Sequence, residues 1–172
     1  MNLLFKKKYY PANASFWTAI EYRLAYGDSV LDIIVNDTAA YIENMVKLLH
    51  VSIDGEKHLY NELLEEALNP NGDIIFFCSL LYEKIMKSDK FLEKYIKNKP
   101  EQETKDSEEQ FDEFFILELF KRTPYPERLL YTASFPQIIG LIIKYSESIS
   151  GGAGTVYKEM STKDIKAFYG VS

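Results

Sequence analysis

Apolar residues recur along most of the chain at intervals of three and four residues, the spacing of one face of an α-helix. The first such pattern consists of Phe16, Ile20 and Leu24, with an asparagine or a serine before it as candidate N-cap. Gly27 follows, and glycine commonly ends helices. The same spacing predicts further helices in the first half of the chain, over residues 37–50, 58–68, 74–87 and 89–97.

The segment 74–87 is apolar nearly all round in its first half, which predicts a helix at the centre of the core. Phe77 is expected to be fully buried in this helix. The single cysteine, Cys78, lies in the same segment and is interpreted as a small buried hydrophobe. One cysteine also excludes an internal disulfide and a multi-cysteine zinc site.

A polar segment separates these patterns from the second half of the chain. Residues 98–110 lack any large apolar side chain, which predicts an acidic loop or linker. The helical pattern over 111–122 places Phe115 and Leu119 inward. Its acidic residues, Glu113 among them, are expected on the opposite, solvated face.

The remaining patterns complete the expected fold. The apolar run 138–143 predicts a helix, but it also fits a buried strand, so a small α+β element near 128–160 stays open. The glycine cluster 150–154 predicts a flexible joint, and 161–170 predicts a short last helix. We therefore expect one helical domain over 1–172, an all-α, irregular bundle of about seven or eight helices.

The net charge of −6 is concentrated in one region. Residues 101–118 carry eight acidic side chains and one lysine, so the rest of the chain is nearly neutral. Non-specific nucleic-acid binding needs a broad basic surface, which this composition does not supply. A nucleic-acid binder that uses the lysine-rich helix 84–99 is nevertheless kept as one alternative.

Location and origin are indicated by composition alone. No run of about 20 apolar residues predicts a membrane span, and the use of cysteine fits a reducing cytosol, so we expect a cytoplasmic protein. The abundant lysine, isoleucine, asparagine, tyrosine and phenylalanine have A/T-rich codons. They indicate a low-GC bacterium, with a phage or another mobile element as one source; the location would then be the host cytoplasm or the virion.

No motif predicts catalysis. The glycine cluster lacks the adjacent lysine of a phosphate-binding loop and the third glycine of a dinucleotide fingerprint. A nucleotide-binding protein or enzyme that uses residues 150–155 remains a second alternative. His58 and Glu62 have a spacing that suits a metal, but the sequence shows no further ligands at matching spacing. We therefore predict no catalytic residue, no metal, no cofactor and no small-molecule ligand.

The aromatic content is high, with 13 tyrosines and 11 phenylalanines. Several tyrosines, including Tyr9 and Tyr10, lie near predicted loops or helix ends, and exposed tyrosine suits protein interfaces. The first hypothesis is a non-enzymatic protein-binding protein: an assembly chaperone, a structural adaptor or an inhibitor that binds another protein or itself. The candidate partner-binding residues are Tyr125, Tyr131, Tyr157, Phe168, Tyr169, Lys94 and Lys97.

Overall fold

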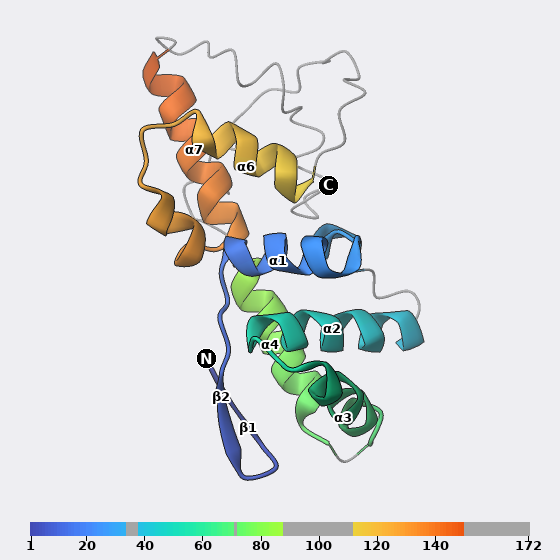
Figure 1. Cartoon of the computed structure of the whole chain (residues 1–172). Helices are drawn as coiled ribbons and strands as arrows, with labels where there is room; N and C mark the ends of the chain where they lie inside the picture. The colour runs from blue at the N-terminus through green and yellow to red at the C-terminus, as the bar shows by residue number, and fades with distance from the viewer. Residues whose placement is uncertain (34–37, 71, 88–111, 150–172) are drawn as a thin grey trace.

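The computed structural model (Figure 1) describes four stretches of the chain: residues 1–33, 38–70, 72–87 and 112–149. Within them the protein is mainly helical, as predicted, but it also contains a small two-stranded sheet, so it is not all-α. These stretches contain six α-helices, not the seven or eight expected. Four predicted features lie outside them: the helices 89–97 and 161–170, the loop 98–110 and the glycine joint 150–154.

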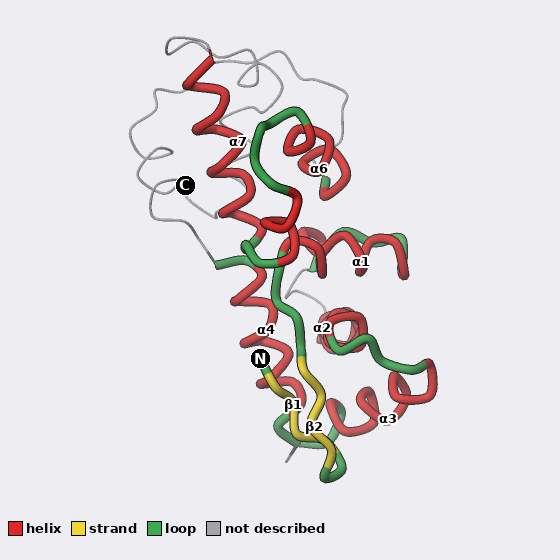
Figure 2. Tube along the Cα trace, turned by 60° about the vertical axis from the view of Figure 1, so that its left-hand side comes forward, coloured by secondary structure: helices red, strands yellow, loops and turns green. Residues whose placement is uncertain are grey.

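A β-hairpin that the sequence patterns did not predict opens the chain. Strand β1 (Asn2–Phe5) pairs antiparallel with β2 (Lys8–Pro11), and together they form a two-stranded sheet. The hairpin lies beside the lower ends of α3 and α4 in both ribbon views (Figures 1 and 2).

The helices follow in chain order and surround a continuous core. Helix α1 lies between α2 on one side and α6 on the other, while α2 packs on both α3 and α4, and α6 packs on α7 (Figure 1). The elements are α1 (Phe16–Tyr26), the 3-10 helix η1 (Val30–Asp32), α2 (Thr38–Ser52), α3 (Lys57–Ala67), α4 (Ile74–Ile85), α6 (Glu113–Lys121), the 3-10 helix η2 (Glu127–Tyr131) and α7 (Phe135–Ile149).

Helix α4 buries one face and exposes another. Its buried positions, at helical spacing, are Ile74, Cys78, Leu81 and Ile85. Burial raises the pKa of the Cys78 thiol to about 12, which agrees with its interpretation as a core hydrophobe. Phe77 is only half-buried, so the prediction of its full burial is wrong; it lies beside the buried face instead of within it.

Local signals set the helix ends. Ser15 occupies the N-cap of α1, and Gly27 ends that helix in the left-handed conformation, with φ of 81°. At the start of α7, the Ser134 backbone N–H donates to Gln137 Oε1 at 2.9 Å, and the Gln137 N–H donates to Ser134 Oγ at 3.4 Å. This capping box begins a helix that continues through 138–143, so the strand alternative for that run is wrong.

Candidate functional site

The hairpin has one buried face and one exposed face. Side chains alternate between the faces of a strand, and Leu3 and Phe5 of β1 are directed into the core, where each is less than a tenth exposed. The intervening positions face outward. Four residues form this outer face, and all four are exposed: Asn2, Leu4, Tyr9 and Pro11.

The centre of the outer face is apolar. Leu4 and Tyr9 are directly opposite each other in the strand register, and they are 57% and 70% exposed. An antiparallel sheet with one face on the core normally presents polar residues on the other face. The Leu4–Tyr9 pair departs from this rule and makes a contiguous exposed apolar surface across the two strands.

The hairpin is held firmly against the helices. Its open end is closed by the Met1 nitrogen donating to the Ala12 carbonyl at 2.9 Å and by the Ala12 N–H donating to the Met1 carbonyl at 2.7 Å. The Asn13 N–H then donates to the C-terminal carbonyl of α2 at Ser52, at 2.8 Å. At the turn, Lys6 Nζ lies 3.0 Å from a carboxylate oxygen of Glu62 on α3. The outer face is therefore presented in a fixed geometry.

The turn of the hairpin consists of lysines in a strained conformation. Lys6 and Lys7 both have positive φ, of 47° and 66°, which is the backbone of a two-residue type I′ turn. Lys8 follows the turn and is opposite Phe5 in the register, so it lies on the side of the inner face. Lys6 and Lys8 also lie over neighbouring rings, 5.5 Å from the Phe5 centroid and 4.9 Å from the Tyr10 centroid.

Two of the residues predicted to bind a partner lie elsewhere. Tyr131, on η2, is 42% exposed, and its ring centroid is 4.8 Å from that of Trp17. Tyr125 is half-buried and stacks on Phe120 at 6.5 Å. Both belong to the connection between α6 and α7, which lies away from the hairpin, in the part of the described molecule formed by α1, α6 and α7 (Figure 1). The structure therefore does not bring them together with Tyr9.

The other predicted partner-binding residues cannot be placed. They lie outside the described ranges: Lys94, Lys97, Tyr157, Phe168 and Tyr169. The same holds for the glycine-rich segment 150–155 and for most of the lysine-rich segment 84–99. In the latter, Lys84 and Lys87 fall within the described ranges, and both are exposed.

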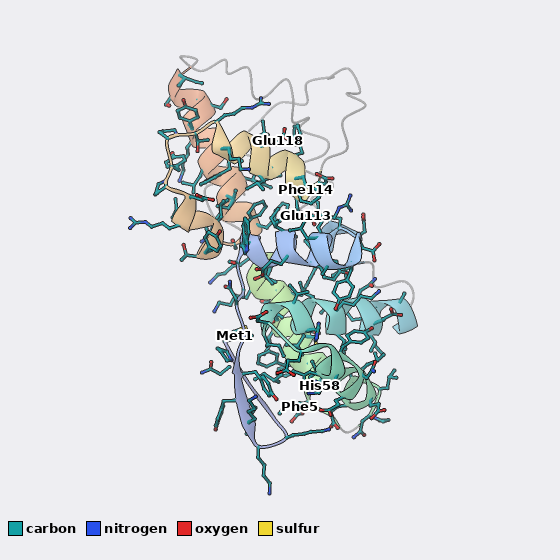
Figure 3. All side chains as sticks on the ribbon, in the orientation of Figure 1. Met1, Phe5, His58, Glu113, Phe114 and Glu118 are labelled. Atoms are coloured by element: carbon teal, nitrogen blue, oxygen red, sulfur yellow. The ribbon has the colours of Figure 1, made fainter. Side chains whose placement is uncertain are left out.

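Glu113 is buried, so the prediction of a solvated acidic face is wrong at this position. Its Oε1 accepts hydrogen bonds from the Ser29 hydroxyl and the Val30 N–H, each at 2.7 Å. Burial raises the pKa of this carboxyl, while these hydrogen bonds and the charge of Arg23 oppose the rise. Figure 3 shows Glu113 on the side of α6 that faces α1, with Glu118 on the far side. The two partners come from 84 and 83 residues earlier in the chain, so no periodicity within α6 could reveal them.

An open hollow of about 600 Å³ lies between α1 and the turn that joins α2 to α3. Its lining includes His50, Ser52 and Asp54, three residue types that also form hydrolytic triads. The hydrogen bonds exclude that role in this geometry. The Ser52 hydroxyl donates to the Leu49 carbonyl at 2.8 Å, and the His50 ring nitrogens lie 3.1 Å from the Tyr26 hydroxyl and 3.0 Å from the Glu56 carbonyl.

The described residues also do not form a metal site. Within these ranges no three histidine, cysteine or acidic side chains converge on a point. His58 lies 3.4 Å from Glu56, and Glu62, its predicted helical partner, pairs with Lys6 instead. Glu62 is therefore paired with the hairpin turn and not with His58.

Comparison of the chain with family models, with curated proteins and with solved structures yields no match. Among the helices within the described ranges, none has both the length and the apolar character needed to cross a bilayer. The outer face of the hairpin is thus the feature from which a function can be inferred.

Proposed function

We propose that the protein is a non-enzymatic protein-binding protein that holds a partner against the outer face of its hairpin. The observation that carries this proposal is the exposed Leu4–Tyr9 pair at the centre of that face. Complete burial of one large apolar side chain contributes about 1.5–3 kcal/mol. Two such side chains side by side are therefore able to anchor an interface, and tyrosine is among the residues enriched at binding hot spots.

The fixed position of the hairpin supports the same proposal. A surface that is already ordered avoids the entropic cost of ordering on association. Leu3 and Phe5 anchor the inner face, and hydrogen bonds between Met1 and Ala12 close the open end of the hairpin. Because the backbone geometry is set before the partner binds, less of the free energy of apolar contact is lost to ordering the hairpin, and the affinity is higher.

A different protein fits this surface better than a second copy of the chain. Face-to-face pairing of two hairpins with their turns at the same end would bring Lys6 and Lys7 of both copies close together, and like charges brought close together destabilise an interface. The roles that we propose are those of an assembly chaperone, a structural adaptor or an inhibitor in the cytoplasm, with a low-GC bacterium or its phage as the source.

The proposal is tested by changing the apolar pair without changing the fold. We expect the double variant Leu4→Ser/Tyr9→Ser to recover at least tenfold less of the main partner from its native host, because two anchor residues are truncated. The matched control is Leu24→Ser on α1, which alters a leucine of similar exposure (66%) and should leave recovery unchanged. Equal recovery with the double variant and the unaltered protein would refute the proposal.

A further inference from the structure

We infer that α6 and α7 form a unit that opens away from the C-terminal end of α1 while it stays attached at the N-terminal end, and that Glu113 is the latch that holds the unit closed. This conformational device is separate from the hairpin and goes beyond the proposed function. It follows from the different contacts that the unit makes at the two ends of α1.

Helices α6 and α7 are packed on each other and joined by η2. In Figure 1 they lie together on the side of α1 that is opposite α2. Their buried positions belong to one apolar cluster, which includes Ile116 and Leu119 of α6 and Ile139 and Ile142 of α7. Because their apolar faces cover each other, the two helices are expected to move together.

At the N-terminal end of α1 the unit is attached mainly by aromatic contacts. The Phe16 and Phe135 rings have no exposed surface, and their centroids are 5.0 Å apart. The Trp17 and Tyr131 centroids are 4.8 Å apart. The Phe16 N–H also donates to the Ala133 carbonyl at 2.8 Å. Separation at this end would return large apolar surfaces to water, so this end is the pivot.

At the C-terminal end of α1 and in η1 the attachment is polar. Glu113 Oε1 accepts from the Ser29 hydroxyl and the Val30 N–H, each at 2.7 Å. Arg23 Nη2 lies 3.4 Å from Asp112 Oδ2, at the N-cap of α6. When the unit opens, water replaces each of these partners, so the net contribution of the polar contacts to closure is modest.

Closure also leaves polar atoms without partners at the latch. Glu113 Oε2 and the Tyr22 hydroxyl are buried, and neither has a hydrogen-bond partner among the described residues. Burial raises the pKa of both groups, and the charge of Glu113 adds to the rise at Tyr22. Opening returns both groups to water, which offsets part of the lost apolar contact. The latch end therefore separates at a lower free energy than the pivot end.

Opening at the latch uncovers a surface that the closed molecule hides. Ile116 lies about one turn after Glu113 on α6, which places both side chains on the side that faces α1. Ile116 and Tyr22 have no exposed surface in the closed form. The open form thus presents an apolar side chain and a phenol to solvent while the pivot stays packed.

Hydrogen exchange of single backbone amides, followed by NMR, tests the device. The Val30 N–H reports on the latch, because it exchanges only after it separates from Glu113. The Phe16 N–H reports on the pivot, because it is bonded to the Ala133 carbonyl. After correction for intrinsic rates, we expect Val30 to exchange at least about tenfold faster than Phe16. Its rate should also depend less on urea, since opening exposes less surface than unfolding.

Three variants separate movement of the unit from other openings. Arg23→Gln removes the ion pair to α6, and Ser29→Ala removes one bond of the latch. Both weaken the closed form relative to the open and the unfolded forms, so both amides should exchange faster, by about threefold and about fivefold. The matched control Ser134→Ala removes the hydroxyl that donates to the Lys87 carbonyl at 2.8 Å, beside the pivot. It should accelerate Phe16 alone, because the open form keeps this contact.

Three outcomes would overturn the inference. Equal exchange rates of Val30 and Phe16 in the unaltered protein would show that the latch separates only when the whole fold does. Acceleration of Val30 by Ser134→Ala would show that the pivot separates together with the latch. Unchanged exchange of Val30 in Arg23→Gln would show that η1 detaches by itself while α6 stays in place.

Discussion

Glu113 and the outer face of the hairpin are opposite exceptions to the usual rule that charged side chains are exposed and large apolar side chains are buried. Glu113 is a charged residue with no exposed surface, and Leu4 and Tyr9 are large apolar residues that are more than half exposed. Each of these residues is close in sequence to buried core residues. They differ in whether the fold supplies partners for their side chains.

Glu113 is supplied with partners by the fold itself. One of its oxygens accepts from Ser29 and Val30, while Arg23 lies close enough to oppose the rise of its pKa. A buried polar group that is hydrogen-bonded in this way is a structural connection between distant segments. The Leu4–Tyr9 pair points outward with no such cover, and for this reason the exposed apolar pair indicates function where the buried charge does not.

The largest effect is expected from the inner face of the hairpin. Phe5→Ala should lower the free energy of unfolding by about 3–5 kcal/mol, because its ring is only 6% exposed. Its neighbour Leu4→Ala should change it by less than about 0.5 kcal/mol. Urea denaturation of both variants measures the contrast, and equal losses would show that the two faces are not distinct.

Removal of the Glu113 carboxylate comes next. Glu113→Ala should cost about 2–3 kcal/mol, since it leaves the Ser29 hydroxyl and the Val30 N–H buried without an acceptor. The matched control is Glu118→Ala, which truncates an exposed glutamate on the same helix. If the control lost as much stability, Glu113 would have no special structural role.

The pH dependence of Glu113 sharpens the comparison further. Its folded-state pKa is raised above the ordinary value near 4.5, so the unfolded chain loses this proton at a lower pH than the folded chain. The contribution of Glu113 to stability is thus greatest below about pH 4.5 and falls as the pH rises toward the folded-state pKa. Each pKa unit of this rise corresponds to about 1.4 kcal/mol.

The variant Glu113→Gln cannot ionise. The difference in free energy of unfolding between the variant and the unaltered protein should therefore move in favour of the variant as the pH rises through that range. Urea denaturation at a series of pH values from 3 to 8 measures this difference. At low pH the variant should be the less stable of the two, because its amide NH₂ occupies the place of Oε2, which has no hydrogen-bond partner among the described residues. A stability difference that does not change with pH would show that Glu113 titrates normally.

The smallest effect on stability is expected from the outer face. Leu4→Ser/Tyr9→Ser should change the free energy of unfolding by less than about 1 kcal/mol, because both side chains are mostly in solvent. Circular dichroism and urea denaturation measure this change. A loss of unfolding free energy as large as that of Phe5→Ala would show that Leu4 and Tyr9 stabilise the fold, and they would no longer be candidates for a binding interface.

The sequence predicted the helices well because their signals are local. The face of α3 shows this, since Leu59 and Leu63 have helical spacing and both are buried. Gly27 ends α1 as expected, and Ser134 caps α7. At Leu24, however, the same pattern predicted burial and the residue is exposed, because the helix packs on the face that carries Tyr22.

The hairpin and the buried carboxylate were missed for a different reason. The strands are only four residues long, and their turn lacks the Asn–Gly or Asp–Gly that marks a type I′ hairpin. The burial of Glu113 depends on η1, far away in the chain. For the candidate site, the abundance of tyrosine drew attention to Tyr9, but the exposure of Leu4 opposite it follows only from the strand register.

Cys78 provides a way to observe the molecule opening. It is the only thiol in the chain, it has no exposed surface in α4, and its pKa of about 12 leaves almost none of it as the reactive thiolate at neutral pH. Alkylation of this thiol therefore reports the fraction of time that the centre of the fold is open to solvent. The same reaction, timed with and without a bound partner, converts association at the hairpin into a measurable rate without any added label.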